Sequence, residues 1–303
     1  MKKSLFFFFS LLLASVMCLA YTLPGCSSET KEDKINYGYD FSSPEQKLIL
    51  PDTLREISGL TILDSSTFAC VQDENGILFL YDSKNNRVKQ EIRFAPDGDY
   101  EGICCVGIAL YVLRSDGELF HISNYASVVP EVETFTTGIP ADNNEGLCYD
   151  SLNNRLLVAC KGKIGKGKEF KDRRVIYAFD LATNTLSDEP VFDFDVNEVI
   201  AFAEEHKIDL PVKEKKNGEV PVLKFRPSAI AIHPLTNELY LLSAVDHALF
   251  VFNTSGVIQH MKMLDETMFN KAEGISFYPN GDLLITNEAQ DKKPTLLKFT
   301  YTP

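Results

Sequence analysis

The sequence lacks an excess of positive charge. It holds 30 Lys and Arg residues against 43 Asp and Glu residues, which gives a formal net charge of −13 at pH 7. A protein that binds nucleic acid by neutralising phosphates needs the opposite sign, and so does an electrostatic attachment to anionic lipid. We therefore expect no nucleic-acid partner and no such attachment.

Several motifs that would indicate a specific chemistry are also missing. After the N-terminal apolar run, no second apolar stretch reaches the length of a membrane-spanning helix. The chain has no C-x-x-C, no Cys/His pair at zinc spacing and no G-x-S-x-G. The sequence therefore gives no support to a zinc site or to serine hydrolase chemistry.

The seven cysteines do not suggest a disulfide scaffold. Cys18 lies in the leader, and Cys26 is discussed below. The other five are an odd number within apolar strand patterns, which favours buried small hydrophobic side chains; they are Cys70, Cys104, Cys105, Cys148 and Cys160.

The N-terminus has the order of an export signal. Lys2 and Lys3 precede the apolar run Leu5–Leu13, which predicts a signal peptide over residues 1–25. The following Leu23-Pro24-Gly25-Cys26 resembles the lipobox of bacterial lipoproteins, in which the cysteine is lipidated after cleavage. That resemblance implies a lipidated, flexible tether over residues 26–40 and attachment to the membrane through Cys26. Ser27 implies sorting to the outer membrane of the cell envelope. Ordinary secretion is the alternative.

A short motif recurs through the remaining chain. Its second position is glycine or alanine, and these positions are 43 to 45 residues apart except for one interval of 83. Each motif is followed by apolar strands with alternating polarity and by glycine-containing turns. The five copies are Ser58-Gly59-Leu60, Glu101-Gly102-Ile103, Glu145-Gly146-Leu147, Ser228-Ala229-Ile230 and Glu273-Gly274-Ile275.

This repeat length predicts an all-β fold, a single β-propeller of four-stranded antiparallel blades over residues 41–303. We count five blades, with six as the alternative. The long interval is explained by a lengthened hairpin at 162–173 and by an insertion at 195–220, which holds a short helix and the charged loop Lys213–Gly218. The strand-like segment Gln46–Leu50 is expected to complete the last blade and remove its open edge.

The first position of the motif places acidic residues near the predicted axis. Glu101, Glu145 and Glu273, with Asn287, form a candidate metal site whose hard oxygen donors suit Ca²⁺. Two alternatives stay open: a structural ring in which these glutamates pair with Arg114, Lys161 or Arg226, and acid/base catalysis around a metal-bound water. Further residues are expected to line the same mouth; they are Ser58, Asp73, Arg114, Lys161, Ser228, Asp246 and Glu288.

The recurring Ser-Gly-Leu and Glu-Gly-Ile/Leu motifs, with Asp99-Tyr100-Glu101-Gly102-Ile103 and Asn144-Glu145-Gly146-Leu147, resemble the SdiA-regulated (YjiK/CarP-like) β-propeller family over about 48–299. That resemblance implies an envelope propeller with a calcium connection and no established reaction. We therefore expect a lipid-anchored module that binds a small molecule or an envelope protein. The alternative is a metal-dependent propeller hydrolase of the phosphoesterase or lactonase type.

Overall fold

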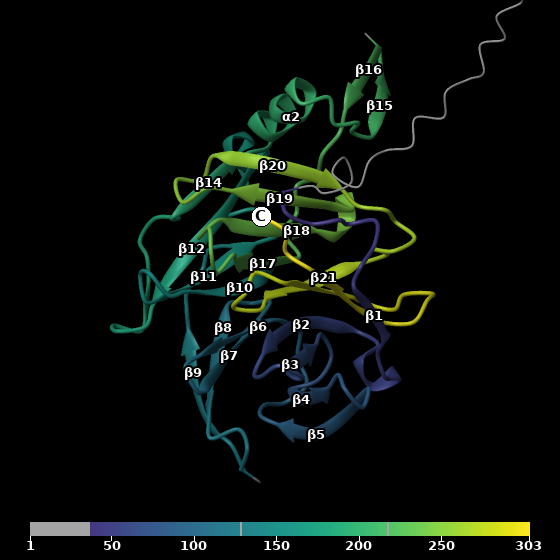
Figure 1. Ribbon diagram of the computed structural model, residues 1–303. Coiled ribbons are helices and arrows are strands. Elements are labelled where there is room, and N and C mark those ends of the chain that lie inside the picture. The colour runs from purple at the N-terminus through teal and green to yellow at the C-terminus, as the bar shows by residue number, and fades with distance from the viewer. Residues whose placement is uncertain (1–36, 128, 217) are drawn as a thin grey trace, which may run out of the picture.

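Five antiparallel sheets surround a common centre, as the sequence repeat predicts. The computed structural model describes residues 37–127, 129–216 and 218–303. Figure 1 shows the innermost strands β2, β6, β10, β17 and β21 gathered at the centre, with the later strands of each sheet progressively farther out. These five inner strands contact one another in a closed ring. The fold is therefore a five-bladed β-propeller, and the six-bladed alternative is wrong.

In the first four blades the strands follow the sequence from the centre outward, and in the third blade both β13 and β14 pair with β12. The first blade is β2 (Ile57–Ile62), β3 (Thr67–Gln72), β4 (Ile77–Asp82) and β5 (Arg87–Arg93). The second is β6 (Tyr100–Val106), β7 (Ala109–Arg114), β8 (Glu118–Ser123) and β9 (Glu131–Thr136). The third is β10 (Asn144–Asp150), β11 (Arg155–Cys160), β12 (Arg173–Asp180), β13 (Thr185–Leu186) and β14 (Phe192–Asp195). The fourth is β17 (Ala229–Ile232), β18 (Leu239–Ser243), β19 (Ala248–Phe252) and β20 (Ile258–Met263).

The fifth blade is closed by the N-terminal strand, as predicted. It consists of β21 (Ala272–Phe277), β22 (Leu283–Asn287), β23 (Thr295–Phe299) and β1 (Gln46–Ile49). Strand β1 pairs antiparallel with β23, so that Gln46 lies opposite Lys298. This pairing occupies an edge of the last sheet that would otherwise be open.

The hydrophobic core is divided among the five interfaces between neighbouring blades. Because successive strand residues point to opposite faces of a sheet, β3 contributes Phe68 and Cys70 to the interface with the fifth blade and Ala69 and Val71 to the interface with the second. The other three interfaces hold equivalent clusters. Four of the five predicted core cysteines are buried and all five are free, while Cys105 is half-buried.

The long repeat interval contains the predicted insertions and one element that sequence reasoning missed. Helix α2 (Val196–Glu205) begins at Asp195, whose carboxylate caps the helix by accepting from the Asn197 backbone N–H at 2.8 Å. The segment predicted as a charged loop is instead a hairpin of β15 (Val212–Lys215) and β16 (Gly218–Pro221). The Asn-Gly pair at 217–218 is the turn signal that could have predicted it.

Ordered packing begins before the end of the predicted tether. The predicted signal peptide over residues 1–25 and Cys26 lie outside the described residues. Tyr39, within the predicted 26–40 tether, is fully buried against the fourth and fifth blades, and its hydroxyl donates to the Gly281 carbonyl at 2.6 Å. The predicted flexible tether therefore does not extend through Tyr39.

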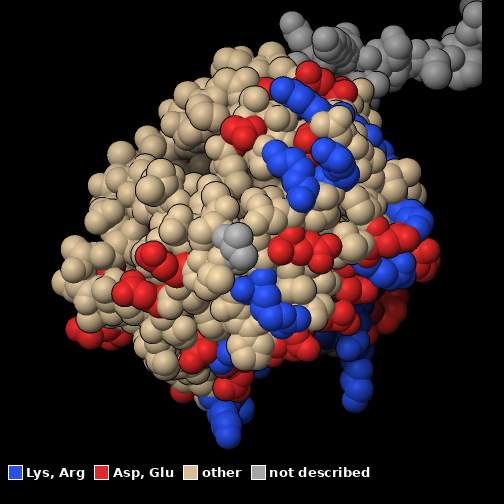
Figure 2. Space-filling model, turned by 90° about the horizontal axis from the view of Figure 1, so that it is seen from below, with Lys and Arg blue, Asp and Glu red and all other residues tan. Residues whose placement is uncertain are grey.

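The surface of the propeller has charges of both signs. Figure 2 shows acidic and basic side chains interspersed over one face, with no broad positive patch. No helix among the described residues has the length and apolar character that crossing a bilayer requires.

The small residue of each motif is required by close approach of the inner strands. A Cβ atom added to Gly102 would lie 2.8 Å from the Leu147 Cβ and 3.1 Å from the Glu145 carbonyl oxygen in the next blade. One added to Gly59 would lie 3.3 Å from the Gly102 Cα. Backbone contact between neighbouring blades thus explains why this position is glycine or alanine.

We expect Gly102→Ala to destabilise the protein by about 1–3 kcal/mol, because the neighbouring backbone would have to move. A thermal melt should show a lower midpoint. Gly98→Ala is the matched control, since its added Cβ would meet only side chains and no backbone, the Arg114 side chain at 3.1 Å and the Tyr100 ring at 3.3 Å. Equal melting temperatures for the two variants would contradict the close-packing explanation.

Candidate functional site

A β-bulge places the acidic residues at the mouth. In four of the five inner strands the ladder register shifts across the residue before the glycine, which is Ser58, Glu101, Glu145 or Glu273. A bulge leaves the extra residue out of the ladder and re-aims its side chain. The repeat therefore directs equivalent side chains from different blades to the same end of the axis.

The predicted acidic residues do come together there. One small central pocket is lined by Glu101, Glu145 and Glu273, together with Ser58 and three of the inner-strand glycines. Glu145 and Glu273 are buried, with relative exposures of 2 % and 5 %. The side chains that the sequence analysis assigned to one mouth from three different blades thus share one pocket.

The serine copies of the motif have a structural task. The Ser58 hydroxyl donates to the Tyr100 carbonyl at 2.5 Å, and the Ser228 hydroxyl donates to the Ala272 carbonyl at 2.7 Å. Each acceptor directly precedes the motif glutamate of the next blade. Ser58 and Ser228 therefore join neighbouring blades and hold in place the backbone that carries Glu101 and Glu273.

The buried carboxyl groups favour their protonated forms. Burial, followed by the nearby Glu145 carboxylate, raises the pKa of Glu101 to about 9. Burial and Glu145 raise the pKa of Glu273 to about 8. Both shifts follow from loss of solvation and repulsion between like charges. The Glu101 and Glu273 carboxyl groups therefore hold protons at neutral pH unless another cation balances their negative charge.

Two lysines already compensate part of the charge. The Lys161 ammonium contacts Glu145, as one of the sequence alternatives predicted, and the Lys271 ammonium contacts Glu288 and lies 3.5 Å from Glu273. Burial lowers the pKa of Lys271, but these carboxylates outweigh it and hold its pKa above the usual range. The Glu145 Oε2 atom is buried and has no hydrogen-bond partner among the described residues, so the compensation is incomplete.

Three acidic side chains beside this pocket have the spacing of metal ligands. In the described part of the chain, oxygen atoms of Glu56, Asp73 and Glu288 all lie within 4.8 Å of one another. Hydrogen bonding to the Glu288 side chain, followed by burial, raises the pKa of Glu56, and burial raises the pKa of Asp73. Glu101, Glu145 and Glu273 do not form a second such group of acidic side chains among the described residues, and the predicted site that adds Asn287 to them stays a prediction.

Sequence reasoning placed Asp73 and Glu288 at the mouth and missed Glu56. Asp73 and Glu288 directly follow the strands β3 and β22, so their position at one end of the blades was predictable. Glu56 directly precedes β2, at the same end of the blade. Its place two residues before the Ser58 motif position was the available signal.

The remaining predicted mouth residues have partners of their own. Arg114 forms ion pairs with Asp116 and Glu118 of its own blade, at 2.7 and 2.6 Å. The Asp246 carboxylate accepts from the Lys224 and Phe225 backbone N–H groups at 2.9 and 2.8 Å. These contacts give Arg114 and Asp246 structural roles in their own loops.

Asn287 is fully buried beside the mouth. Its Nδ2 donates to the Met268 carbonyl at 3.2 Å and to the Thr295 hydroxyl at 3.0 Å. Its Oδ1 has no partner among the described residues, so one oxygen donor of the predicted metal set is left free.

Comparisons with solved structures agree with the propeller fold. A glutaminyl cyclase from Myxococcus xanthus matches with a TM-score of 0.56 and 16% identity, over 85% of this chain and 95% of that one. The PQQ-bound aldose sugar dehydrogenase from Streptomyces coelicolor matches with a TM-score of 0.51 and 10% identity, over 86% and 98%. At these identities the likeness extends to the fold alone.

No protein-family model and no curated protein matches the chain, so the resemblance to the SdiA-regulated family stays a prediction.

The buried glutamates predict that stability falls as pH rises. A carboxyl group whose pKa is higher in the folded than in the unfolded chain adds to the free energy of unfolding. This contribution is complete below the pKa of the unfolded chain, about 4.5, and is lost as pH rises through the pKa of the folded chain, about 8 to 9. We expect the melting temperature in metal-free buffer to decrease from pH 5 to pH 9, and Glu101→Gln with Glu273→Gln to remove most of that decrease. Glu91→Gln, on the exposed outer strand β5, should keep it. An unchanged pH profile in the double variant would contradict the assigned protonation.

Proposed function

We propose that the protein is a lipid-anchored binding module of the cell envelope that takes up a cation, Ca²⁺, at the propeller mouth. One observation carries this proposal: six carboxyl groups meet at one mouth with two lysines to balance them. They are Glu56, Asp73, Glu101, Glu145, Glu273 and Glu288. A bound divalent cation would supply the missing positive charge and allow the buried carboxyls to ionise.

The chemistry of the donors favours calcium over a soft metal. Ca²⁺ takes six to eight oxygen ligands, from carboxylates, carbonyls and water. Glu56, Asp73 and Glu288 supply up to six carboxylate oxygens from the first and fifth blades, and the other ligands would be carbonyls or waters. Lys271 contacts Glu288 and is therefore the resident competitor for this site. An arriving cation would have to displace its ammonium group.

Membrane attachment completes the proposed role. The lipobox-like Leu23-Pro24-Gly25-Cys26 would place a lipidated Cys26 about a dozen residues upstream of Tyr39, where packing against the propeller begins. Several acyl chains hold a protein at a membrane far more firmly than one. The propeller would then bind its ligand, a small molecule or an envelope protein, close to the bilayer.

A second candidate function is catalysis at the same mouth. The observation that favours it is the Glu101 carboxyl, whose raised pKa of about 9 keeps a proton available at neutral pH, as a general acid requires. A metal-dependent hydrolase acting on phosphoesters or lactones is the form predicted from the sequence. Phosphoesters and lactones are therefore the substrate classes to assay.

Calorimetric titration of the metal-free protein with CaCl₂ tests the binding function. We expect wild type to bind, Asp73→Asn and Glu288→Gln each to weaken binding at least tenfold, about 1.4 kcal/mol, and Lys271→Met to tighten it by removing the competitor. Glu74→Gln, next to Asp73 but exposed, is the matched control. The site would be contradicted if wild type bound no Ca²⁺, or if Glu74→Gln weakened Ca²⁺ binding as much as Asp73→Asn and Glu288→Gln do. Turnover of the assayed substrates by wild type, with loss of this turnover in Glu101→Gln, would instead favour catalysis.

Fractionation of producing cells tests the anchor. Wild type should co-sediment with membranes and carry lipid on Cys26 by mass spectrometry, whereas Cys26→Ser should be released as a soluble exported protein. Cys105→Ser serves as the control, because that residue lies in the propeller. Wild-type protein without lipid would exclude the proposed attachment.

A further inference from the structure

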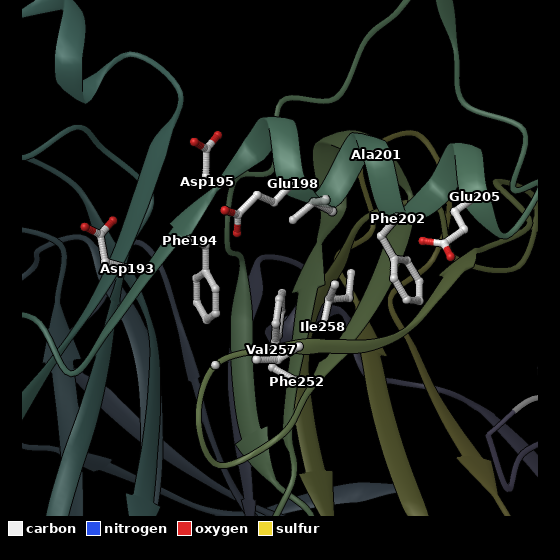
Figure 3. A pocket seen from close by; sticks show the side chains of 12 residues that line it. Asp193, Phe194, Asp195, Glu198, Ala201, Phe202, Glu205, Phe252, Val257 and Ile258 are labelled. Atoms are coloured by element: carbon white, nitrogen blue, oxygen red, sulfur yellow. The ribbon is translucent and has the colours of Figure 1, made fainter.

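A groove lies on the outer side of the propeller, away from the mouth. Its walls are helix α2, strand β14 and the turn between β19 and β20, and its volume is about 390 Å³. Figure 3 shows the rings of Phe194 and Phe252 and the side chain of Ile258 beneath the helix, with Phe202 projecting from the helix toward them. None of the residues that line the central pocket lines this groove.

The groove is built by the insertion rather than by the blade repeat. In the part of the chain that the structure describes, helix α2 has no counterpart in the other four blades. Gly256, in the opposing turn, has a φ of +79°, and an added Cβ would lie 3.0 Å from the Phe192 ring. The turn therefore approaches the aromatic side chains of β14 as closely as a glycine allows, and the apolar floor is formed by packing between two blades.

The rim of the groove is negatively charged. The described residues that line it include four carboxylates and no lysine or arginine; the carboxylates are Asp193, Asp195, Glu198 and Glu205. Arg173 pairs with Asp193 at 2.5 Å and lies 3.8 Å from Asp195. Glu198 and Glu205 have no ion-pair partner among the described residues, and both carboxylates stand at the groove in Figure 3.

The position of Glu205 adds to this field. It is the last residue of α2, and the last turn of this helix contains no basic residue. The C-terminal end of a helix carries partial negative charge, which favours cations and disfavours carboxylates. Glu205 thus reinforces the negative potential at that end of the groove instead of compensating it.

We propose that this groove binds a small amphipathic organic cation, with an apolar or aromatic body on the phenylalanine floor and an ammonium group at Glu198 or Glu205. The volume is near the lower end of the range of about 300–1,000 Å³ for small-ligand sites. The apolar floor fits the body of such a ligand and the acidic rim fits its ammonium group, so floor and rim favour the same ligand. This site is independent of the proposed cation site at the mouth.

Three matched probes test the charge requirement. Phenethylamine, 2-phenylethanol and 3-phenylpropionate share an aromatic body and differ in charge, and calorimetry with ligand-observed NMR on the folded propeller measures their binding. We expect the amine to bind at least tenfold more tightly than the alcohol, and the anion not to bind. Glu198→Gln with Glu205→Gln should reduce binding of the amine to the level of the alcohol.

Two further variants separate the rim from the floor. Glu204→Gln, an exposed neighbour on the same helix that does not line the groove, should leave amine binding unchanged. Phe202→Ala should weaken amine and alcohol alike, with the melting temperature of each variant confirming that it folds. Three results would each overturn the proposal. The amine and the alcohol could bind equally well, or Glu204→Gln could lose as much amine binding as the variant with both Glu198→Gln and Glu205→Gln. The third is binding of a lysine-rich peptide without binding of the amine.

Discussion

The close approach of five inner strands at one axis is the constraint on which the rest of the molecule depends. At this distance a Cβ on Gly102 would collide with the next blade, so the motif needs a small residue. The preceding residue is displaced from the ladder by a bulge and points to the end of the axis. Packing thereby selects which side chains meet at the mouth.

The same packing sets the electrostatics of the site. Carboxyl groups held among inner strands lose solvation and repel one another, which raises the pKa of Glu101 and Glu273. Lys161 and Lys271 offset part of this negative charge. Where the motif has serine in place of glutamate, at Ser58 and Ser228, the side chain adds no charge and hydrogen-bonds to the next blade. Protons and lysines therefore compete for the same oxygens at the mouth, and the proposed cation would compete with both.

Much of this arrangement could be predicted from the sequence. The repeat of 43 to 45 residues indicated five blades, and the strand-like Gln46–Leu50 indicated closure of the last one. Glu56 was missed because it precedes β2 and lies outside the repeated motif, although it meets Asp73 and Glu288 at the spacing of metal ligands. Arg114, which was expected to line the mouth, forms ion pairs with Asp116 and Glu118 of its own blade. The hairpin at 212–221 was missed because all four residues of its first strand are exposed and give no apolar pattern.

The groove at α2 lay beyond sequence reasoning for a related reason. Its walls come from β14, an inserted helix and a turn about fifty residues later, and no local pattern shows that these will meet. The carboxylates of the helix look like an ordinary solvated face when read along the chain. Only the packing of the third blade against the fourth puts an apolar floor beneath them.

The most direct test of the central claim is a pH titration of the glutamate side-chain carboxyl carbons by ¹³C NMR in metal-free buffer, with Glu101→Gln and Glu273→Gln assigning the signals. The account predicts that the carboxyls of Glu101 and Glu273 remain largely protonated at pH 7 and ionise when a divalent cation is added. Fully ionised signals for both residues at pH 7, with midpoints near the ordinary value for glutamate, would contradict it.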